Sequence, residues 1–303
     1  MGQAKKGNSD FWYHVAAFAM ILVWGISFLN TRVLLDVGLT PTEIFVARFT
    51  IAYLSLLAVC RFKVKYTGWR DELLFVVCGV AGGSAYFIAE NTALEYTLIS
   101  DVAVLVSTAP LTTALMGAIF YRDERITWMT CLGMVIAFIG SVMLAMKNGL
   151  VWGDSIVGDL LALLAAFVWA FYSMALKRLN KTYTTSFITR KLFFYGLLSA
   201  LPFLAMEDSH ISWETLKQPA VWGNLLYLGL ICSMAAYFIW GITVKRIGAV
   251  RASNYFYLSP IISMIAAAIW FGERTTAIAY VGCALILVGV IMAEKFKRKP
   301  PEA

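Results

Sequence analysis

The stretch Val102–Thr127, VAVLVSTAPLTTALMGAIFYRDERIT, returns near the other end of the chain as Ala252–Thr275, ASNYFYLSPIISMIAAAIWFGERT. Each copy is an apolar run that contains one proline and closes with a Glu-Arg pair. Seven residues then separate the arginine from a first glycine, and six more lead to a second. A fixed internal repeat indicates that one structural unit occurs twice. The equivalent residues are Pro110 and Pro260, Glu124-Arg125 and Glu273-Arg274, Gly133 and Gly282, and Gly140 and Gly289.

The composition favours lipid as the solvent of this chain. Of the 303 residues, 60% are hydrophobic and only 14% are charged. A water-soluble protein needs more polar side chains to cover its surface, whereas a protein in lipid can be apolar all round. The net charge of +7 comes from short basic clusters between apolar runs. Such clusters favour contact with anionic lipid over contact with nucleic acid.

The apolar runs predict ten transmembrane helices, because a helix needs about 20 mostly apolar residues to cross the hydrocarbon core. The predicted helices are 13–35, 41–61, 72–92, 96–121, 127–146, 156–177, 187–205, 220–243, 250–271 and 277–293. Short turns join most of them, which leaves no room for a soluble domain. We expect a cytoplasmic tail at 1–12, a first repeat at 13–149, a second repeat at 150–293 and a basic cytoplasmic tail at 294–303.

The basic residues predict the orientation, because cytoplasmic loops are enriched in Lys and Arg. Most of these residues fall on one side of the membrane if both termini are cytoplasmic. One repeat holds five helices, an odd number, so the second copy enters the membrane in the opposite sense. Inverted repeats are typical of secondary transporters, whose halves rock about a site near the membrane midplane. We therefore expect an all-α membrane protein with two inverted five-helix repeats around a central cavity.

Several further motifs follow one another in a defined order. They are Trp24-Gly25 with Phe28, Pro41 to Arg48-Phe49, Asn91-x-Ala93-Leu94-x-Tyr96, the two proline-bearing helices with their Glu-Arg closures, and Gly158-Asp159. Together they resemble the drug/metabolite transporter superfamily, and within it the EamA-type ten-helix permeases. The resemblance covers nearly the whole chain. It implies a permease of the bacterial inner membrane with a central cavity, often an exporter of amino acids or other small metabolites.

Two ionisable side chains inside the predicted helices are candidate substrate ligands, because a charge inside the bilayer is costly. Arg48 lies seven residues beyond Pro41, and its guanidinium suits a substrate carboxylate or phosphate. The alternative is a structural arginine that pairs with Glu43, Glu90 or helix-end carbonyl groups. Glu90 is a candidate proton carrier that would couple export to proton entry, or else an interfacial or salt-bridged glutamate. The neighbouring Asn91 is a further candidate for substrate binding.

The two repeated prolines are candidate hinge or gate residues. Pro110 and Pro260 each remove a backbone hydrogen bond and are expected to kink their helices. Neighbouring hydroxyl groups can satisfy the carbonyl groups that are freed, and Asn254 can do the same or help to line a cavity. The alternative is a static kink that packing holds in place.

Aromatic side chains within the helices are candidates for the wall of a substrate pocket, although most aromatic residues in membrane proteins pack or anchor at the interface. Trp24 and Trp169 hold equivalent places in the two repeats, and the group 255–257 directly precedes Pro260, which makes these the strongest candidates. The aromatic candidates for the pocket wall are Trp24, Tyr86, Trp169, Tyr172, Tyr237, Trp240, Tyr255 and Tyr257, and all of them except Trp240 are also candidate substrate-binding residues.

No cofactor and no metal are expected. The five cysteines stand singly, without the spacing of a metal site, and are expected to be buried small hydrophobic residues. An intramembrane enzyme would need convergent His, Asp, Ser or Cys side chains, and the sequence has two distant histidines, His14 and His210. A channel would need rings of like charge or a repeated carbonyl filter. Neither class fits as well as a carrier.

The sequence therefore predicts a secondary-active transporter that exports small metabolites such as amino acids by alternating access, with coupling to protons. A facilitative carrier, or an uptake permease for another metabolite or a drug, is the alternative. The expected partners are a small-molecule substrate, protons and membrane lipids. The substrate, the coupling ion, the direction of transport and the oligomeric state stay open at this point.

Overall fold

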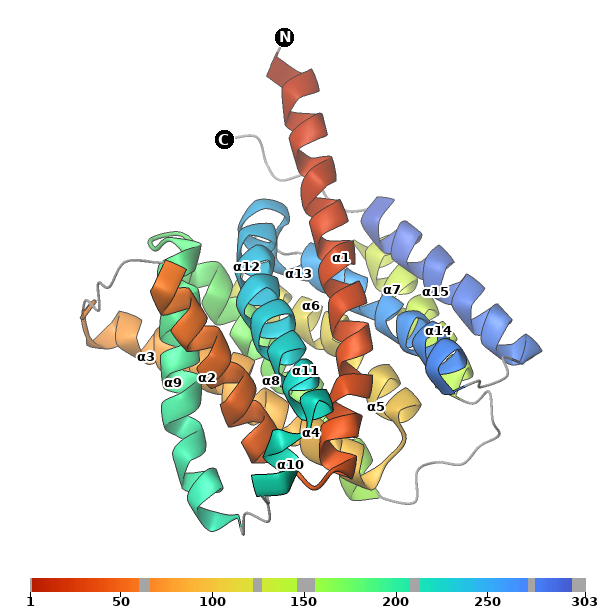
Figure 1. Cartoon of the computed structure of the whole chain (residues 1–303). Helices are drawn as coiled ribbons and strands as arrows, with labels where there is room; N and C mark the ends of the chain where they lie inside the picture. Colours follow the sequence, from red (N-terminus) through yellow and green to blue (C-terminus); the bar gives the residue numbers. More distant parts are fainter. Residues whose placement is uncertain are drawn as a thin grey trace.

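The structure is a computed structural model that describes residues 2–59, 66–121, 127–145, 156–207, 213–271 and 276–295. Helices make up nearly all of these residues (Figure 1). Eight helical stretches are long and apolar enough to cross a membrane. Two shorter apolar helices, Trp128–Met143 and Ala277–Ala293, bring the described stretches to the ten that the sequence predicts.

The helices divide into two halves. The first half contains α1 (Gly2–Asp36), α2 (Pro41–Val59), α3 (Trp69–Gly79), the π-helical η1 (Val80–Ser84), α4 (Ala85–Tyr96), α5 (Ile99–Val106), α6 (Ala109–Phe120) and α7 (Trp128–Ala145). The second half contains α8 (Ile156–Leu179), α9 (Thr185–Met206), α10 (Trp213–Lys217), α11 (Pro219–Leu226), the π-helical η4 (Tyr227–Ala235), α12 (Ala236–Ile247), α13 (Ala249–Ser253), the 3-10 helix η5 (Asn254–Leu258), α14 (Ser259–Phe271) and α15 (Ala277–Lys295). Residues 2–12, expected as a tail, continue the first helix.

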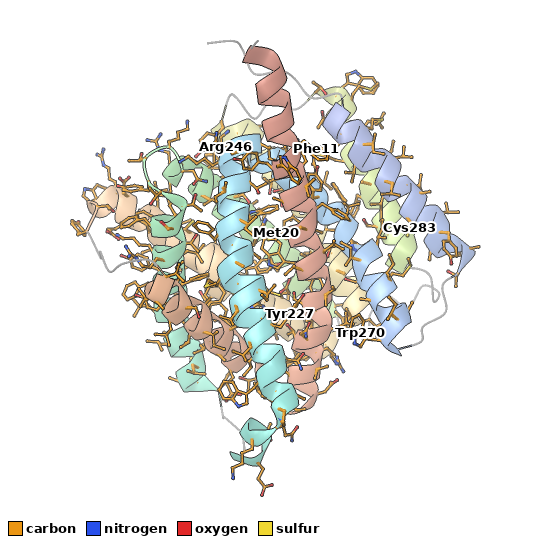
Figure 2. All side chains as sticks on the ribbon, turned by 45° about the horizontal axis from the view of Figure 1, so that its top comes forward. Phe11, Met20, Tyr227, Arg246, Trp270 and Cys283 are labelled. Atoms are coloured by element: carbon orange, nitrogen blue, oxygen red, sulfur yellow. The ribbon has the colours of Figure 1, made fainter. Side chains whose placement is uncertain are left out.

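Apolar side chains cover most of the outside of the helix bundle (Figure 2). Trp270 of α14 and Ile291 of α15 are among many large apolar side chains that are exposed there, as lipid contact allows. Cys78 and Cys232 are buried as expected, but Cys283 is half-buried and Cys131 is exposed on α7, which corrects that prediction. In lipid an apolar side chain gains little from moving inward, so sequence polarity alone does not decide its burial. Cys60 lies outside the described residues.

The last helices of the two repeats run antiparallel. A Cβ added to Gly133 of α7 would lie 2.6 Å from the backbone nitrogen of Ala293, late in α15. A Cβ added to Gly140 would lie 2.6 Å from the carbonyl oxygen of Gly282, early in α15. The repeated glycines are therefore the points where the two backbones touch, since small residues let membrane helices approach closely. This geometry confirms the inverted arrangement of the two five-helix units.

Each half packs into the other. From the first half, α1 lies against α12 and α14, and from the second half, α8 lies against α4 and α6. In the same way α2 contacts η4, while α9 contacts η1. Corresponding helices thus take corresponding neighbours across the interface, so that the centre of the bundle is lined by both halves.

The two repeated prolines stand where helices are interrupted. α5 ends at Val106 and α6 begins at Ala109, so Pro110 lies in the first turn of a new helix. In the other half, η5 precedes α14, and Pro260 is the second residue of α14. A proline in a first turn sacrifices no hydrogen bond, because the N–H at that place has no helical partner. The kink predicted within each helix is thus a break between two helices.

Two hydroxyl groups complete the break in the first half. The Oγ of Ser107 donates to the carbonyl oxygen of Val104 at 2.6 Å, and the Oγ1 of Thr108 donates to that of Leu105 at 2.7 Å. These bonds satisfy carbonyl groups at the end of α5, as the sequence predicts. The Glu-Arg pairs that close the repeated stretches, at 124–125 and 273–274, lie outside the described residues.

Candidate functional site

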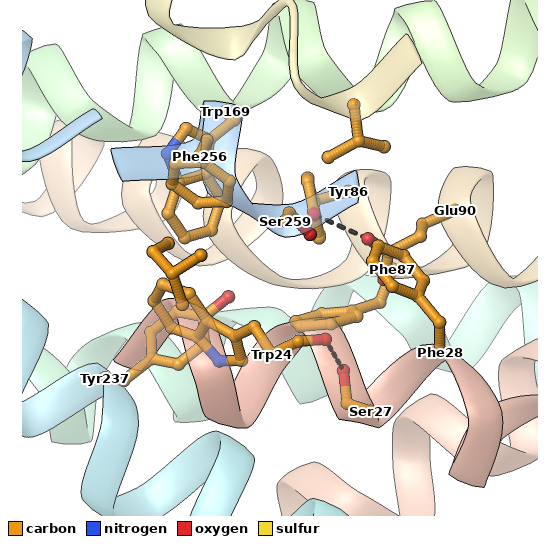
Figure 3. A pocket seen from close by; sticks show the side chains of 12 residues that line it. Trp24, Ser27, Phe28, Tyr86, Phe87, Glu90, Trp169, Tyr237, Phe256 and Ser259 are labelled. Carbon is orange, nitrogen blue, oxygen red and sulfur yellow. Dashed lines mark hydrogen bonds between the residues drawn. The ribbon is translucent and has the colours of Figure 1, made fainter. Parts of the chain in front are cut away.

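A small cavity lies between the two halves, near the breaks in the helices (Figure 3). Side chains from α1, α4, α5 and α8 meet there with side chains from α12, η5 and α14. The space left between them is about 20 Å³, which is room for about one water molecule. The cavity is therefore closed around its own side chains, and it has to widen before a metabolite can enter.

Aromatic rings form most of the cavity wall. The ring centroids of Trp24 and Trp169 are 5.6 Å apart in an edge-to-face arrangement, so the equivalent tryptophans of the two repeats meet here. Tyr237 lies 5.8 Å from Trp24, and Tyr86 lies 5.1 Å from Trp169, between ring centroids. Rings in such contacts contribute more stability than the burial of their apolar surface alone would give. Their faces suit an apolar side chain and also an ammonium group.

Two of these aromatic side chains also hold the π-helical segments in place. The Nε1 of Trp24 donates to the carbonyl oxygen of Cys232 in η4 at 2.8 Å, and the hydroxyl of Tyr237 donates to that of Gly82 in η1 at 2.5 Å. A π-helix departs from the regular backbone ladder, and such segments occur frequently at functional sites. The cavity wall and the two irregular segments are therefore parts of one structure.

Glu90 supplies the carboxylate among the residues that line the cavity. The hydroxyl of Tyr86, one turn earlier on α4, donates to its Oε1 at 2.6 Å. The side chain is buried, with 5% of its surface exposed, and it is attracted by the positive charge of Arg48. An interfacial glutamate exposed to solvent, the alternative in the sequence analysis, does not match this position.

Arg48 lies behind the cavity wall and is completely buried. Its Nε donates to the Oγ of Ser233 in η4 at 3.0 Å, and its Cζ lies 4.1 Å from the ring centroid of Phe87. Within the described part of the chain, its two terminal nitrogens have no hydrogen-bond partner. No ion pair within 4.0 Å joins Arg48 to Glu43 or Glu90 in that part. The guanidinium group thus has buried N–H donors that are free to bind a ligand.

A second charged cluster ties the two halves together within the first half of α9. Lys191 forms an ion pair with Glu72 of α3, which also accepts a hydrogen bond of 2.5 Å from the hydroxyl of Tyr195. The backbone nitrogen of Thr67 donates to the same carboxylate at 3.0 Å. From the sequence, Lys191 is expected only as one of the basic residues on the cytoplasmic side. Its partner could not be inferred, because Glu72 is 119 residues away in the sequence.

A matching contact lies at the other end of α9. The carboxylate of Glu207 accepts hydrogen bonds of 2.5 Å from the hydroxyls of Thr40 and Thr42, at the start of α2. Both contacts join a helix of the first half to a helix of the second. One lies in the first third of α9 and the other just after its last residue.

The structure brings five of the predicted substrate-binding residues to the cavity: Trp24, Tyr86, Glu90, Trp169 and Tyr237. Two others, Arg48 and Tyr172, lie directly behind its wall, and the ring centroid of Tyr172 is 4.7 Å from that of Trp169.

The remaining four candidates lie elsewhere. Asn91 donates to the carbonyl oxygen of Pro41 at 3.1 Å, which ties α4 to the start of α2. Tyr255 shares a hydrogen bond of 2.7 Å with His14, and Asn254 and Tyr257 are buried outside the cavity lining. A substrate contact for these four residues stays a prediction that this geometry does not support.

Six lining residues were not among the candidates. They are Ile21, Ser27, Phe28, Phe87, Val106 and Ser259. Phe256, the middle residue of the candidate group 255–257, also lines the cavity, whereas Tyr255 and Tyr257 do not. Phe87 carries a signal that could have been used, because the tripeptide Ala-Tyr-Phe occurs at 85–87 and again at 236–238, after the π-helical segment in each half.

The sequence model of the EamA-like transporter family matches residues 11–146 and again residues 156–294. The chain belongs to this family. The two matches coincide with the two halves of the fold, and membership makes the protein an integral membrane transporter of the drug/metabolite transporter superfamily rather than an enzyme.

Relatives of this EamA-like transporter carry names that point to export. It is 28% identical to the "Probable terminal-alkyne amino-acid exporter" of Streptantibioticus cattleyicolor, over 92% of this chain and 93% of the relative. It is 25% identical to the "Probable amino-acid metabolite efflux pump" of Escherichia coli K12, over 91% of this chain and 92% of the relative. A solved structure with a TM-score of 0.73 and 21% identity covers 93% of this chain and 98% of its own, and it supports the fold.

Proposed function

We propose that this EamA-like transporter is a secondary-active exporter of small metabolites, with amino acids as the leading class, and that export is coupled to proton entry. The observation that carries the proposal is the closed aromatic cavity with a carboxylate, at the interface of two inverted halves. Secondary transporters place their substrate at this kind of interface. The names of the two exporters described above favour amino acids or their metabolites as cargo.

Alternating access gives the contacts at the two ends of α9 a role. The pair Lys191 and Glu72 holds the halves together in the first third of α9, and Glu207 with Thr40 and Thr42 holds them together just after its last residue. Both contacts are made in the state in which the cavity is too small for a metabolite. Transport then requires that one set breaks while the other holds, so that the cavity faces one side of the membrane at a time.

Glu90 is the proposed proton site. Its carboxylate lines the cavity and is buried, so a proton or a cationic substrate group bound there would replace the other. A proton that enters from outside would release the substrate, and its departure to the cytoplasm would restore the empty carboxylate. This exchange would drive export with the proton gradient. A facilitative carrier or an uptake permease would use the same cavity without that dependence.

A thermal-shift screen of metabolites on the purified protein tests the proposal. We expect one or a few amino acids to raise the melting temperature of the wild type, because a ligand that binds only the folded state stabilises it. The same compounds should not stabilise Trp24→Ala, which removes a central ring of the cavity wall. Equal stabilisation of both proteins would place the ligand elsewhere and would contradict the proposed site.

A further inference from the structure

We infer that the site recognises both charges of a zwitterionic α-amino acid, and that Phe87 acts as a shutter which covers the carboxylate ligand, Arg48, until the substrate is present. The inference rests on the proposed function, because it assigns the substrate class of the same cavity. The inference predicts a carrier that transports an amino acid and rejects both the amine and the carboxylic acid that have the same side chain as that amino acid.

Arg48 is suited to bind a carboxylate because part of its guanidinium group makes no hydrogen bond with the residues that the structure describes. Its two terminal nitrogens are buried without a partner among the described residues, while its Nε is held by Ser233. Buried donors that stay unpaired destabilise the folded state, and more so when they belong to a charged group. A carboxylate can accept both terminal N–H groups in the bidentate geometry that guanidinium favours. Among the described residues, no carboxylate takes that place.

Phe87 separates this guanidinium from the cavity. Its ring covers Arg48 at 4.1 Å, and its side chain is also part of the cavity lining. The ring belongs to a cluster with Phe49 and Tyr237, at centroid distances of 5.5 Å and 6.3 Å. Because aromatic side chains change rotamer by rotation about two bonds, the ring can uncover Arg48 without unfolding α4. While it is closed, the cation–π contact partly compensates the charge.

Glu90 supplies the complementary ligand for the ammonium group. It lies three residues after Phe87 on α4, so the two side chains share one face of the helix. Its carboxylate borders the cavity beside aromatic faces that also attract cations. Arg48 and Glu90 attract each other without forming an ion pair. An amino acid between them would satisfy both charges at once.

This arrangement predicts which analogues are rejected. An amine would leave the uncovered Arg48 without a partner, and a carboxylic acid would meet Glu90 with no charge to match it. A site built to pair a polar group discriminates strongly against an analogue that lacks the group, because its own buried atoms are then left unpaired. Selection should therefore come from the α-ammonium and α-carboxylate groups rather than from the side chain.

The test uses the full chain in proteoliposomes and six compounds. They are L-phenylalanine with phenethylamine and 3-phenylpropanoate, and L-leucine with isoamylamine and 4-methylpentanoate. We expect the wild type to move at least one of the two amino acids, and to prefer it to its amine and its acid by about 100-fold or more. In Arg48→Gln the preference over the amine should fall to within about threefold, and Arg48→Lys should restore part of it.

Phe87→Ala tests the shutter without touching a charge. Each compound is added as an unlabelled competitor of labelled amino-acid transport. Phe87→Ala should make the amino acid and the acid stronger competitors by a similar factor, because the ring no longer has to move. The amine should compete as it does with the wild type. In the background of Arg48→Gln the same substitution should have no such effect. Phe193→Ala is the matched control, since Phe193 packs on Phe49 and Tyr237 in the same cluster but does not cover Arg48.

The outcomes separate the inference from the proposed function. If the wild type moves the amine or the acid as well as the amino acid, the inference is overturned while export stands. It is also overturned if Phe87→Ala and Phe193→Ala have the same effect on competition by the amino acid, the amine and the acid. Loss of transport when gluconate replaces chloride would overturn it as well, since chloride would then be the anion bound at Arg48. If none of the six compounds moves, the inference is overturned for this pair of amino acids, and the thermal-shift screen decides separately whether export of amino acids stands.

Discussion

Gly133 of α7 and Gly289 of α15 face each other so closely that a Cβ on Gly289 would lie 2.5 Å from the carbonyl oxygen of Gly133. The two residues belong to the repeated glycines that the sequence shows, and the antiparallel crossing brings the second glycine of one copy to the first glycine of the other. The spacing that first revealed the repeat is thus the spacing that this crossing requires. Neither glycine has a positive φ, so close approach, rather than backbone freedom, explains both.

Gly289→Leu should push α15 away from α7 and cost about 3 kcal/mol of stability, because the added side chain meets backbone atoms that cannot turn aside. A lower melting temperature in detergent is the expected result. Gly223→Ala serves as the control, since a Cβ there would meet nothing within 4 Å. If both variants melt like the wild type, the glycine crossing does not hold the two repeats together.

Tyr237→Phe should destabilise the protein by about 1–3 kcal/mol, because the carbonyl oxygen of Gly82 would lose the hydroxyl that satisfies it. The ring contacts of the cavity wall would be kept. Thermal unfolding of the purified variant measures the change, with the exposed Tyr96→Phe as control. An unchanged melting temperature for Tyr237→Phe would show that this bond does not support the π-helical segment.

Lys191→Met should cost about 2 kcal/mol, since it leaves the carboxylate of Glu72 without its cation in a poorly solvated place. The double variant Lys191→Met with Glu72→Leu should recover much of that loss, because no unpaired charge remains. The double variant should also expose the cavity more often at that end of the bundle. Labelling of Ser27→Cys with a membrane-impermeant maleimide measures this exposure, and a rate equal to that of the intact pair would contradict the role of the contact.

Glu90→Gln should remove the dependence of export on the pH gradient, because an amide at this place cannot exchange a proton. The amide oxygen can still accept the hydrogen bond of Tyr86, so the fold should be kept. Transport measured with and without an imposed pH gradient gives the answer. Glu95→Gln, on the same helix but outside the cavity lining, is the control and should keep the dependence. A pH dependence that survives Glu90→Gln assigns the coupling to another group.

The ten helices and their inversion could be predicted because both follow from local properties of the sequence. A run of about 20 apolar residues defines a crossing without any knowledge of its neighbours, and the repeat with its odd helix count defines the inversion. The breaks at Pro110 and Pro260 were predicted as kinks, because a proline shows that a helix is disturbed and not whether it ends. The outward position of Cys131 was missed for the related reason that lipid accepts apolar side chains.

The cavity could be predicted only in part. Trp24 and Trp169 were found because the repeat relates them, and Glu90 because a carboxylate within a helix is rare. Phe87 was missed, since its importance comes from the place of its ring between the cavity and Arg48, and ring direction depends on packing between helices. Of the candidate group 255–257, the cavity lining contains Phe256 and neither tyrosine, and sequence alone does not show which member of the group faces inward. A substrate contact of Tyr255 or Tyr257 stays a prediction.

The most direct test of the account is counterflow in proteoliposomes that contain the purified protein. Vesicles loaded with an unlabelled amino acid that stabilises the protein are diluted into a trace of the same compound in labelled form. An alternating-access carrier predicts transient accumulation of label that saturates with concentration and is lost in Trp24→Ala. Label that enters without saturation, or at the same rate whether or not the vesicles are loaded, would contradict the account.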